Sequence, residues 1–280
     1  MSQHPDYSVI VPALNEEDRL RDPLLGTMDY FRGRSLDFEV VVVDDGSTDA
    51  TSEVVRTLQG QHPELRLIRL PSNRGKGFAV RTGVVNSSGR VVLFTDADGA
   101  TPIQEVERLE ERLEDGAEVA IGSRALSSDE VEVETRVYRK IIGRVFHTLV
   151  SFLTVGDFHD TQCGFKMLRG DVARELFGDL RMDGFSFDVE LLSMALWRGY
   201  RVDEVPVNWS HVPGSSINLL TDSLRMLRDL FVIRSRLHRN AYGERGSGRY
   251  SDGSERIGEA RGPGSMKDRQ DQPARASGGL

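Results

Sequence analysis

Five short apolar runs recur along the first half of the chain, each followed by a polar turn. They lie at residues 7–11, 37–43, 65–70, 90–95 and 117–122. Helical stretches are expected between them, at about 15–31, 50–60, 76–85 and 102–113. Strands that alternate with helices in this way are typical of an open, mostly parallel sheet with helices on both faces. We therefore predict an α/β, Rossmann-like fold.

Polar clusters follow the apolar runs. Ligands of open α/β sheets bind beyond the carboxyl ends of the strands, so these clusters are expected to meet at one rim. Two of them also suggest helix starts, because Asn15 and the segment 47–49 are suitable caps. The clusters are Asn15-Glu16, Asp44-Asp45, Asn73 to Lys76, Asp96 to Asp98 and Ser123-Arg124.

The run at 91–102, V-V-L-F-T-D-A-D-G-A-T-P, ends in Asp96 and Asp98. Residues two apart on an extended chain point to the same side. Two neighbouring carboxylates repel each other unless a cation lies between them. Mg²⁺ and Mn²⁺ prefer oxygen ligands and often combine carboxylates with substrate phosphates. We predict such a metal at Asp96 and Asp98; the alternative is a solvated acidic turn after a core strand.

Composition excludes several classes of protein. The net charge of -8 argues against a broad nucleic-acid surface. The lone cysteine, Cys163, excludes an internal disulfide and suits a reducing compartment. No signal-like segment opens the chain, and no apolar run is long enough for a membrane span. We expect a cytoplasmic protein, peripheral on the inner face of a membrane. Neither a P-loop nor a G-x-G-x-x-G follows the first strand, which excludes two common nucleotide folds.

The ordered motifs P-A-L-N-E at 12–16, V-D-D-G-S-T-D at 43–49, N-R-G-K-G at 73–77 and D-A-D at 96–98 resemble family 2 inverting glycosyltransferases of the GT-A fold. In the second half, G-S-R at 122–124, D-T-Q-C-G-F-K at 160–166, F-S-F-D-V-E-L-L at 185–192 and E-V-P-V-N-W at 204–209 are similar to the dolichyl-phosphate β-glucosyltransferase branch. The resemblance covers roughly residues 7–238. Related mannose synthases often have an amide soon after D-x-D, where this chain has G-A-T-P, so a third protein ligand for the metal is in doubt.

The resemblance implies metal-dependent transfer of glucose from UDP-glucose to a polyprenyl, dolichyl-type phosphate, with inversion at the anomeric carbon. It suggests Asp44 as acceptor of the uracil N3–H, although Asp45 is chemically equivalent. Lys76 is expected to contact a phosphate. The implied nucleotide-binding residues are Pro12, Ala13, Leu14, Asn15, Glu16, Asp44, Asp45, Lys76, Asp96 and Ala97.

The acceptor phosphate calls for arginines, which bind phosphate in bidentate fashion. Arg124 and Arg139 match acceptor-phosphate positions of the family, and Arg136 lies nearby; the alternative for each is a surface ion pair. Gln162 and Lys166 are placed on the acceptor side. The expected catalytic residues are Asp98, Arg124, Arg139 and Asp188.

Asp188 and Glu190 stand two apart in an expected helix, which puts them on different faces, so only one should face the site. A general base and a helix cap are both open roles for Asp188.

We expect residues 1–125 to form a nucleotide-sugar-binding half and 126–240 an acceptor-binding half of one domain. A disordered tail is expected at 241–280. Segments 141–156 and 217–238 are amphipathic. In the second, an apolar stripe of Leu220, Leu224, Leu227 and Phe231 is flanked by arginines, which fits either packing or an anionic membrane surface.

Two other functions remain open at this point. One is a polyprenyl-phosphate mannosyltransferase using GDP-mannose. The other is a non-catalytic nucleotide-sugar-binding protein, against which the intact Asp96, Asp98 and Arg124 argue. A processive polysaccharide synthase is disfavoured because Q-x-x-R-W and several membrane spans are missing from the sequence.

Overall fold

The computed structural model describes residues 4–126, 158–212, 219–243, 246 and 249–251. Within these residues, one eight-stranded sheet runs in the order β3-β2-β1-β4-β6-β5-β7-β8. Its strands are β1 (Tyr7–Ala13), β2 (Phe38–Asp44), β3 (Leu65–Arg69), β4 (Val91–Thr95), β5 (Val119–Ser123), β6 (Phe165–Arg169), β7 (Arg201–Pro206) and β8 (Arg249–Ser251). The helices are α1 (Arg21–Gly33), α2 (Thr51–Gln59), α3 (Lys76–Val85), η1 (Ile103–Glu105), α4 (Val106–Glu114), α6 (Gly170–Asp179), α7 (Phe187–Arg198) and α8 (Leu219–His238).

The predicted α/β fold is confirmed, and the five apolar runs form β1 to β5. β1, β2, β3 and β4 pair in parallel, as do β5, β7 and β8. β6 was not expected: it lies antiparallel between β4 and β5. Its sequence F-K-M-L-R carries a lysine at its second position and an arginine at its last, so it does not look like a buried strand. Through β6 the sheet continues without a break from the first half of the chain into the second.

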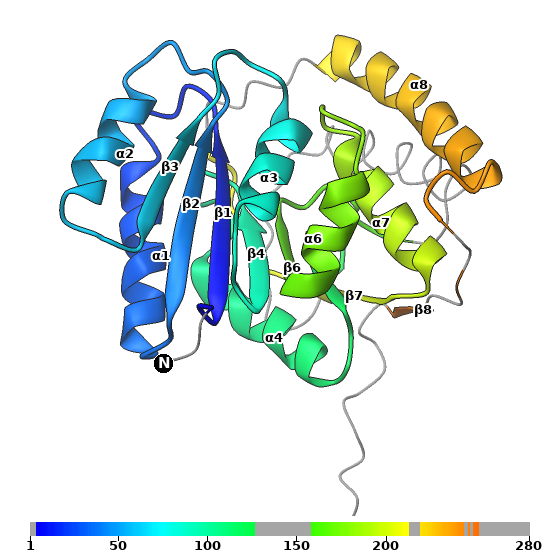
Figure 1. Ribbon diagram of the computed structural model, residues 1–280, viewed down its shortest axis with the longest axis horizontal. Helices are drawn as coiled ribbons and strands as arrows, with labels where there is room; N and C mark the ends of the chain where they lie inside the picture. Colours follow the sequence, from blue (N-terminus) through cyan, green and yellow to red (C-terminus); the bar gives the residue numbers. More distant parts are fainter. Residues whose placement is uncertain (1–3, 127–157, 213–218, 244–245, 247–248, 252–280) are drawn as a thin grey trace, which may run out of the picture.

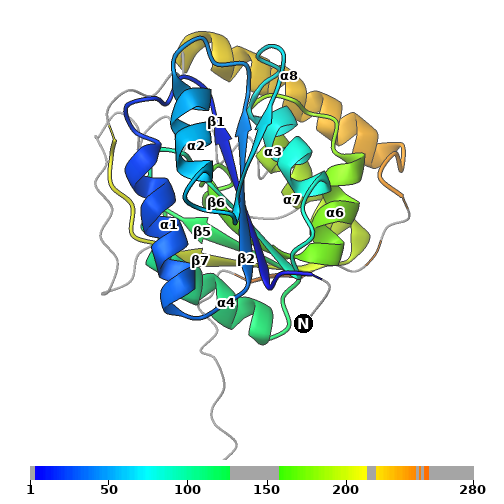
Figure 2. The ribbon, with the colours of Figure 1, turned by 60° about the vertical axis from the view of Figure 1, so that its left-hand side comes forward.

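Side chains that alternate along the strands build two separate cores. Val41 and Val43 face α3, α6 and α7, whereas Val40 and Val42 face α1, α2 and α4. Figures 1 and 2 show these helices on the two faces of the sheet. Burying both faces stabilises a parallel sheet and explains its run of four consecutive valines. Because helices cover both faces of the sheet, the rim predicted from the sequence is formed by the turns that follow the strands.

The C-terminal helix α8 packs on the second half of the chain. Among its described side chains, Leu230, Ile233 and Leu237 are buried, whereas Phe231 is 57% exposed. Of the two alternatives left open for the apolar stripe, packing therefore does not hold for Phe231, because the buried face is rotated away from it. None of the helices in the described parts is both long and apolar enough to cross a bilayer. Segment 141–156 lies outside the described residues.

The chain just after α8 differs from the expected disordered tail. Tyr242 is 1% exposed, and its hydroxyl donates to Glu190 at 2.6 Å. Trp197 Nε1 donates to the Gly243 carbonyl at 3.0 Å, and β8 pairs with β7. A single aromatic side chain with a buried acceptor is enough to anchor a polar segment, and composition does not reveal this. The prediction of disorder from residue 241 is wrong for these residues; 252–280 lie outside the described part.

Candidate active site

The turns after β1 and β2 are tied together by hydrogen bonds. Asn15 adopts a positive φ of 55° and donates its N–H to Ser47 Oγ at 2.9 Å. Its Oδ1 accepts from the Thr48 N–H at 2.9 Å, and the Glu16 N–H donates to Thr51 Oγ1 at 2.8 Å. Asparagine tolerates this left-handed conformation better than most residues. Asn15 therefore does not cap α1, which begins at Arg21; it shapes the rim instead.

Asp44 and Asp45 end β2 with different partners. Asp44 is fully buried, and its oxygens accept from the Ser47 N–H at 2.7 Å and from the Ser52 hydroxyl. Asp45 accepts from the N–H groups of Arg74 and Gly75, both at 2.8 Å. Asp44 thus has no exposed surface, and its contact with a base stays a prediction. Asp45 holds the turn before α3 in place.

The segment 47–49 was expected to cap α2. The residue at the cap position is instead Ala50, which has no polar side chain to cap the helix. Asp49, one residue earlier, does accept a hydrogen bond from the first N–H of the helix, that of Thr51, at 3.0 Å. Gly46, with a φ of 76°, permits the tight packing of this turn, since a Cβ there would lie 2.5 Å from the Ser72 backbone. The turn after β2 and the turn after β3 are therefore in direct contact.

Asp96 and Asp98 follow β4 and face the start of α3. Lys76 Nζ lies 2.6 Å from Asp96 Oδ1, and Asp98 Oδ1 accepts from the Ala100 N–H at 3.1 Å. Gly164 approaches Asp96 so closely that a Cβ would lie 2.1 Å from Oδ2. The carboxylate of Asp96 is therefore confined between an ammonium group and a glycine backbone.

Negative charge accumulates around this turn. Burial raises the pKa of Asp98, and the charge of Asp96 adds to the rise. Burial also raises the pKa of Glu16, which feels both aspartates despite its ion pair with Arg19 at 2.7 Å. A rim with raised carboxyl pKa values gains from an added cation.

Arg124, at the end of β5, is held by Asp160. Its Nε and one Nη donate to the two Asp160 oxygens at 2.6 and 2.8 Å, and its own N–H donates to Asp160 at 3.0 Å. Glu204 of β7 accepts from the Asp160 N–H at 2.8 Å, and the guanidinium lies 5.6 Å from the Trp209 ring. Burial lowers the pKa of Arg124, and Asp160 and, to a smaller extent, Asp96 raise it, as expected if Arg124 and Asp96 lie at one rim. The sequence left a surface ion pair as the alternative role for Arg124. Arg124 does form an ion pair, with Asp160, but at the site and not on the open surface.

Lys166 lies beneath the site and not on its surface. It is fully buried on β6 and donates to Asp188 at 2.5 Å and to the Cys163 carbonyl at 2.6 Å. Asp188 is 2% exposed; burial raises its pKa, against the opposing effect of Lys166 and then Lys76. It therefore neither caps α7 nor faces open solvent as a base would. Lys166 as a residue lining the acceptor side is not supported by this position.

Asp188 and Glu190 do diverge, as their spacing predicted. Glu190 is fully buried and accepts from the Arg181 and Met182 N–H groups at 2.9 and 2.6 Å. Arg236 of α8 also donates to it, at 2.8 Å. Glu190 fixes α8 to α7, and Asp188 alone belongs to the site.

Helix α8 contacts the part of the site that is expected to bind the acceptor at two further points. Gln162 Nε2 lies 3.8 Å from Met226 Sδ, and Ser186 Oγ donates to Asp229 at 2.9 Å. Figure 2 shows α8 on the side of the sheet to which β1 and β2 point. Gln162 is therefore brought to the site, in contact with α8. The predicted acceptor residues Arg136 and Arg139 lie outside the described residues.

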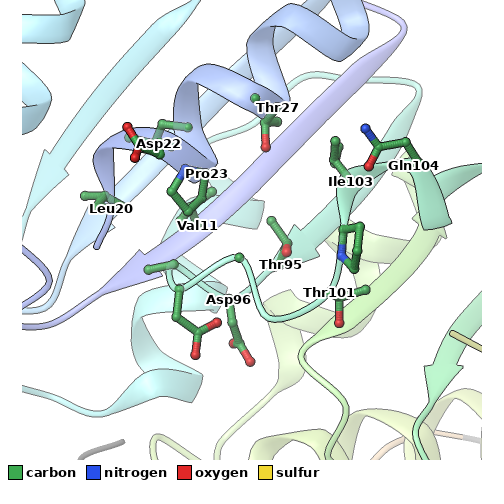
Figure 3. A pocket seen from close by; sticks show the side chains of 16 residues that line it. Val11, Leu20, Asp22, Pro23, Thr27, Thr95, Asp96, Thr101, Ile103 and Gln104 are labelled. Atoms are coloured by element: carbon green, nitrogen blue, oxygen red, sulfur yellow. The ribbon is translucent and has the colours of Figure 1, made fainter. Parts of the chain in front are cut away.

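A cavity of about 300 Å³ lies behind the D-x-D turn, between α1 and η1. Its walls are mostly apolar and include Val11, Pro23 and Ile103. Figure 3 shows the Asp96 side chain pointing away from Thr27 and Ile103. Asp96 and Asp98 border this cavity, whereas Lys76 and Arg124 are not among the residues that line it. We place the chemistry at the polar rim, where Lys76 contacts Asp96.

A family model described as glycosyl transferase family 2 matches residues 8–177, which include both aspartates, Lys76 and Arg124. The chain belongs to glycosyl transferase family 2. By this match and by its relatives in sequence, the chain is a glycosyltransferase.

Relatives of this family 2 chain share one name. It is 40% identical to the dolichyl-phosphate beta-glucosyltransferase of Mus musculus, over 82% of this chain and 75% of the relative. It is 40% identical to that of Drosophila melanogaster, over 81% and 74%, and 34% identical to that of Saccharomyces cerevisiae, over 84% and 77%.

Solved structures with this family 2 fold include glucosyl-3-phosphoglycerate synthase from Mycobacterium tuberculosis. Its complex with UDP matches with a TM-score of 0.60 at 21% identity, over 84% of this chain and 80% of that chain. Its complex with Mn²⁺, UDP and glucosyl-3-phosphoglycerate matches with a TM-score of 0.58 at 20% identity, over 83% and 80%. At this identity the likeness supports the fold.

The residues of the D-x-D turn fit a divalent cation. Asp96 and Asp98 offer hard oxygen ligands, and burial already raises the pKa of Asp98 and of the neighbouring Glu16. In the parts of the chain that are described, no group of three or more His, Cys, Asp or Glu residues is arranged to hold a metal. A cation here would therefore take its remaining ligands from substrate oxygens and water, as Mg²⁺ commonly does.

Three residues of the site escaped the sequence argument. Asp160 and Gly164 stand in the motif D-T-Q-C-G-F-K, and Glu204 opens E-V-P-V-N-W. Their roles depend on Arg124 and Asp96, which lie far away in sequence. The only signal was that both motifs resemble the family, and that signal does not say what each residue touches.

Proposed function

We propose that this protein transfers glucose from UDP-glucose to a dolichyl-type polyprenyl phosphate, with inversion and with Mg²⁺ or Mn²⁺ as cofactor. One observation carries the proposal. Asp96 and Asp98 form a carboxylate pair suited to a metal-bound diphosphate, and Arg124, which could bind a second anion, lies near enough to interact with this pair electrostatically through Asp96. Arg124 interacts with Asp96, and Lys76 interacts with both. The names and identities of the relatives support the choice of sugar and lipid.

On the donor side, each rim residue has a distinct task. A divalent cation held by Asp96 and Asp98 would neutralise charge developing on the leaving diphosphate. Lys76, at the start of α3, is placed to donate to a phosphate oxygen, and the helix N-terminus favours the same anion. The turn at Pro12 to Glu16 is rigidly tied to the next turn and would flank the base and ribose.

On the acceptor side, the nucleophile is itself an anion. A phosphate monoester has a second pKa of about 6 and is mostly dianionic at neutral pH. It needs a cation to offset its repulsion by the donor diphosphate more than it needs a general base. Arg124 supplies that cation, with Arg139 and Arg136 as further candidates from the part of the chain outside the structure.

The chemical step follows from this arrangement. An acceptor phosphate oxygen forms a bond to the anomeric carbon while the bond from that carbon to the diphosphate oxygen breaks. The electron pair leaves with UDP, and no proton is transferred. Asp188 forms an ion pair with Lys166 beneath the site, so its role is to supply a fixed negative charge there and not to abstract a proton. We propose this role in place of the two that the sequence left open for Asp188, a general base and a helix cap.

We further propose that the protein sits on the cytoplasmic surface of a membrane, next to its lipid substrate. α8 exposes Phe231 together with Arg225 and Arg228. An aromatic side chain among exposed arginines fits the boundary of an anionic bilayer. Binding of the purified protein to anionic but not to neutral vesicles, reduced in Phe231→Ser, tests this part.

The deciding experiment is a donor panel of UDP-glucose, UDP-galactose and GDP-mannose with a short-chain polyprenyl phosphate. Release of nucleoside diphosphate is measured with Mg²⁺, with Mn²⁺ and with excess chelator. We expect turnover with UDP-glucose only when metal is present. Preference for GDP-mannose would favour the mannosyltransferase alternative, and no turnover with any donor would favour a binding protein.

Asp98→Asn sharpens this experiment. It keeps the shape of the turn but removes a carboxylate ligand, so turnover should fall by about 10²-fold or more while thermal unfolding is little changed. Full activity of this variant would remove the metal from the proposal.

A further inference from the structure

Lys76 lies where a metal ion would need space. Its Nζ is 2.6 Å from Asp96 Oδ1, and its side chain is 19% exposed at the foot of α3. Lys76 also interacts electrostatically with Asp188, which is already ion-paired to Lys166. The ammonium group is thus a positive charge resident in the metal site itself.

Asp96 has little freedom to serve two cations at once. The Gly164 backbone lies against the carboxylate and blocks its movement on that side, although the Asp96 side chain is 39% exposed elsewhere. An ammonium in contact with one ligand oxygen repels a divalent ion and competes for that oxygen. A metal entering the rim would have to displace Lys76 or bind beside it.

A nucleoside diphosphate changes this balance. The turn before α3 is held by Asp45 through the Arg74 and Gly75 N–H groups, so Lys76 starts from a fixed point. A diphosphate at this helix N-terminus offers the ammonium new oxygen partners. Lys76 can then leave Asp96, whose freed oxygen becomes available to the metal.

We propose that Lys76 is an exchangeable counterion that makes metal binding depend on the nucleotide. Without donor, it neutralises Asp96 and keeps divalent cations weakly bound. With donor, it moves to the diphosphate and Asp96 binds the metal. This inference rests on the proposed function, because it takes a metal and a nucleoside diphosphate as the ligands of this rim.

The test measures Mn²⁺ binding directly, by electron paramagnetic resonance of the free ion, with and without UDP. In the unaltered protein UDP should tighten Mn²⁺ binding at least tenfold. Lys76→Met should bind Mn²⁺ alone at least tenfold more tightly than the unaltered protein, and UDP should add correspondingly less. By linkage, Mn²⁺ should also strengthen UDP binding less in Lys76→Met, which calorimetry can check.

Arg56→Met is the matched control. Arg56 forms an exposed ion pair with Glu53 on α2, so this change removes the same charge far from the rim. It should leave both Mn²⁺ affinities unchanged. Lys76→Gln serves as the second variant, should Lys76→Met fold poorly by circular dichroism.

The outcomes separate this inference from the function on which it rests. Unchanged or weaker Mn²⁺ binding by Lys76→Met and Lys76→Gln, with normal coupling in the unaltered protein, overturns the counterion role and leaves the proposed function standing. No Mn²⁺ binding to the unaltered protein, even with UDP, overturns both. A tighter metal site that has lost its dependence on UDP supports the exchange.

Discussion

The donor rim and the acceptor side of this glycosyltransferase are held together in different ways. On the proposed donor rim, Asp45 and Asp98 accept hydrogen bonds from backbone N–H groups of the turns, although Lys76 and Asp96 also form an ion pair there. On the acceptor side, side chains from separate elements pair as ions, as in Arg124 with Asp160 and Lys166 with Asp188.

The difference has consequences for how each region responds to change. A backbone N–H group is still present after most substitutions of the residue that carries it. The donor rim should therefore tolerate changes in the side chains of its donor residues. A buried ion pair fails when either partner is lost, because the remaining charge is then unpaired in a medium of low polarity. We therefore expect the acceptor side to be the more fragile region.

Removal of Lys166 should have the largest effect. Lys166→Met leaves Asp188 without its partner in a fully buried position, and the free energy of unfolding should fall by about 3–5 kcal/mol. Urea denaturation followed by circular dichroism measures the loss. The double variant Lys166→Met/Asp188→Leu should recover most of it. A single variant that unfolds like the unaltered protein would contradict the view that the pair supports the acceptor side.

Gly164→Ala tests where the two regions meet. The new Cβ would press on the Asp96 carboxylate and displace it, so turnover should fall by about 10²-fold through lost positioning. Gly178→Ala in α6 is the matched control, because no atom lies within 4 Å of its added Cβ. That control should keep full activity and be slightly more stable. Equal activity of the two variants would show that Asp96 can be displaced without a loss of turnover.

Asp160→Asn should separate the two substrates. It leaves Arg124 without its carboxylate, so the KM for polyprenyl phosphate should rise while UDP binding, measured by calorimetry, stays near normal. Steady-state kinetics with each substrate varied in turn gives the split. A defect confined to the donor would move Arg124 to the other side of the reaction.

The same variant carries a pH signature. Burial works against the charge of Asp160, but Arg124 lowers the pKa of this carboxyl below its ordinary value. A lowered folded-state pKa adds stability that is present above the unfolded-state pKa of about 4 and lost as the pH falls through the folded value. The stability advantage of the unaltered protein over Asp160→Asn should therefore be full at pH 7 and shrink below about pH 4. Denaturation at a series of pH values checks it.

Cys163 should show the smallest effect. Burial raises the pKa of its thiol to about 12, and the side chain is 1% exposed. The thiolate fraction at pH 8 is then very small, so a thiol-reactive dye should label the folded protein far more slowly than the unfolded one. Rapid labelling of the folded protein would mean that the segment around Gly164 opens.

Much of the donor rim could be predicted from the sequence. The turns after β1 to β4 lie directly after apolar runs, and a parallel sheet brings the ends of such runs together. The roles within each turn could not be predicted. Asn15 binds the neighbouring turn instead of capping α1, and Asp44 is closed off by Ser47 and Ser52. Which hydrogen bond a polar side chain makes depends on distances that spacing does not specify.

The sequence by itself determined the α/β fold, the family and the position of Asp96 and Asp98, because these follow from local periodicity and contiguous motifs. Only the tertiary structure decided that Lys76 rests on Asp96, that Asp160 holds Arg124 and that Lys166 is buried against Asp188. These contacts join residues that are 20, 36 and 22 positions apart. The first contact arises because α3 begins at the rim beside the end of β4; the other two arise because β6 inserts antiparallel between β4 and β5 and brings the second half of the chain under the rim. Charges so far apart in sequence reveal their partners only when the sheet has placed them.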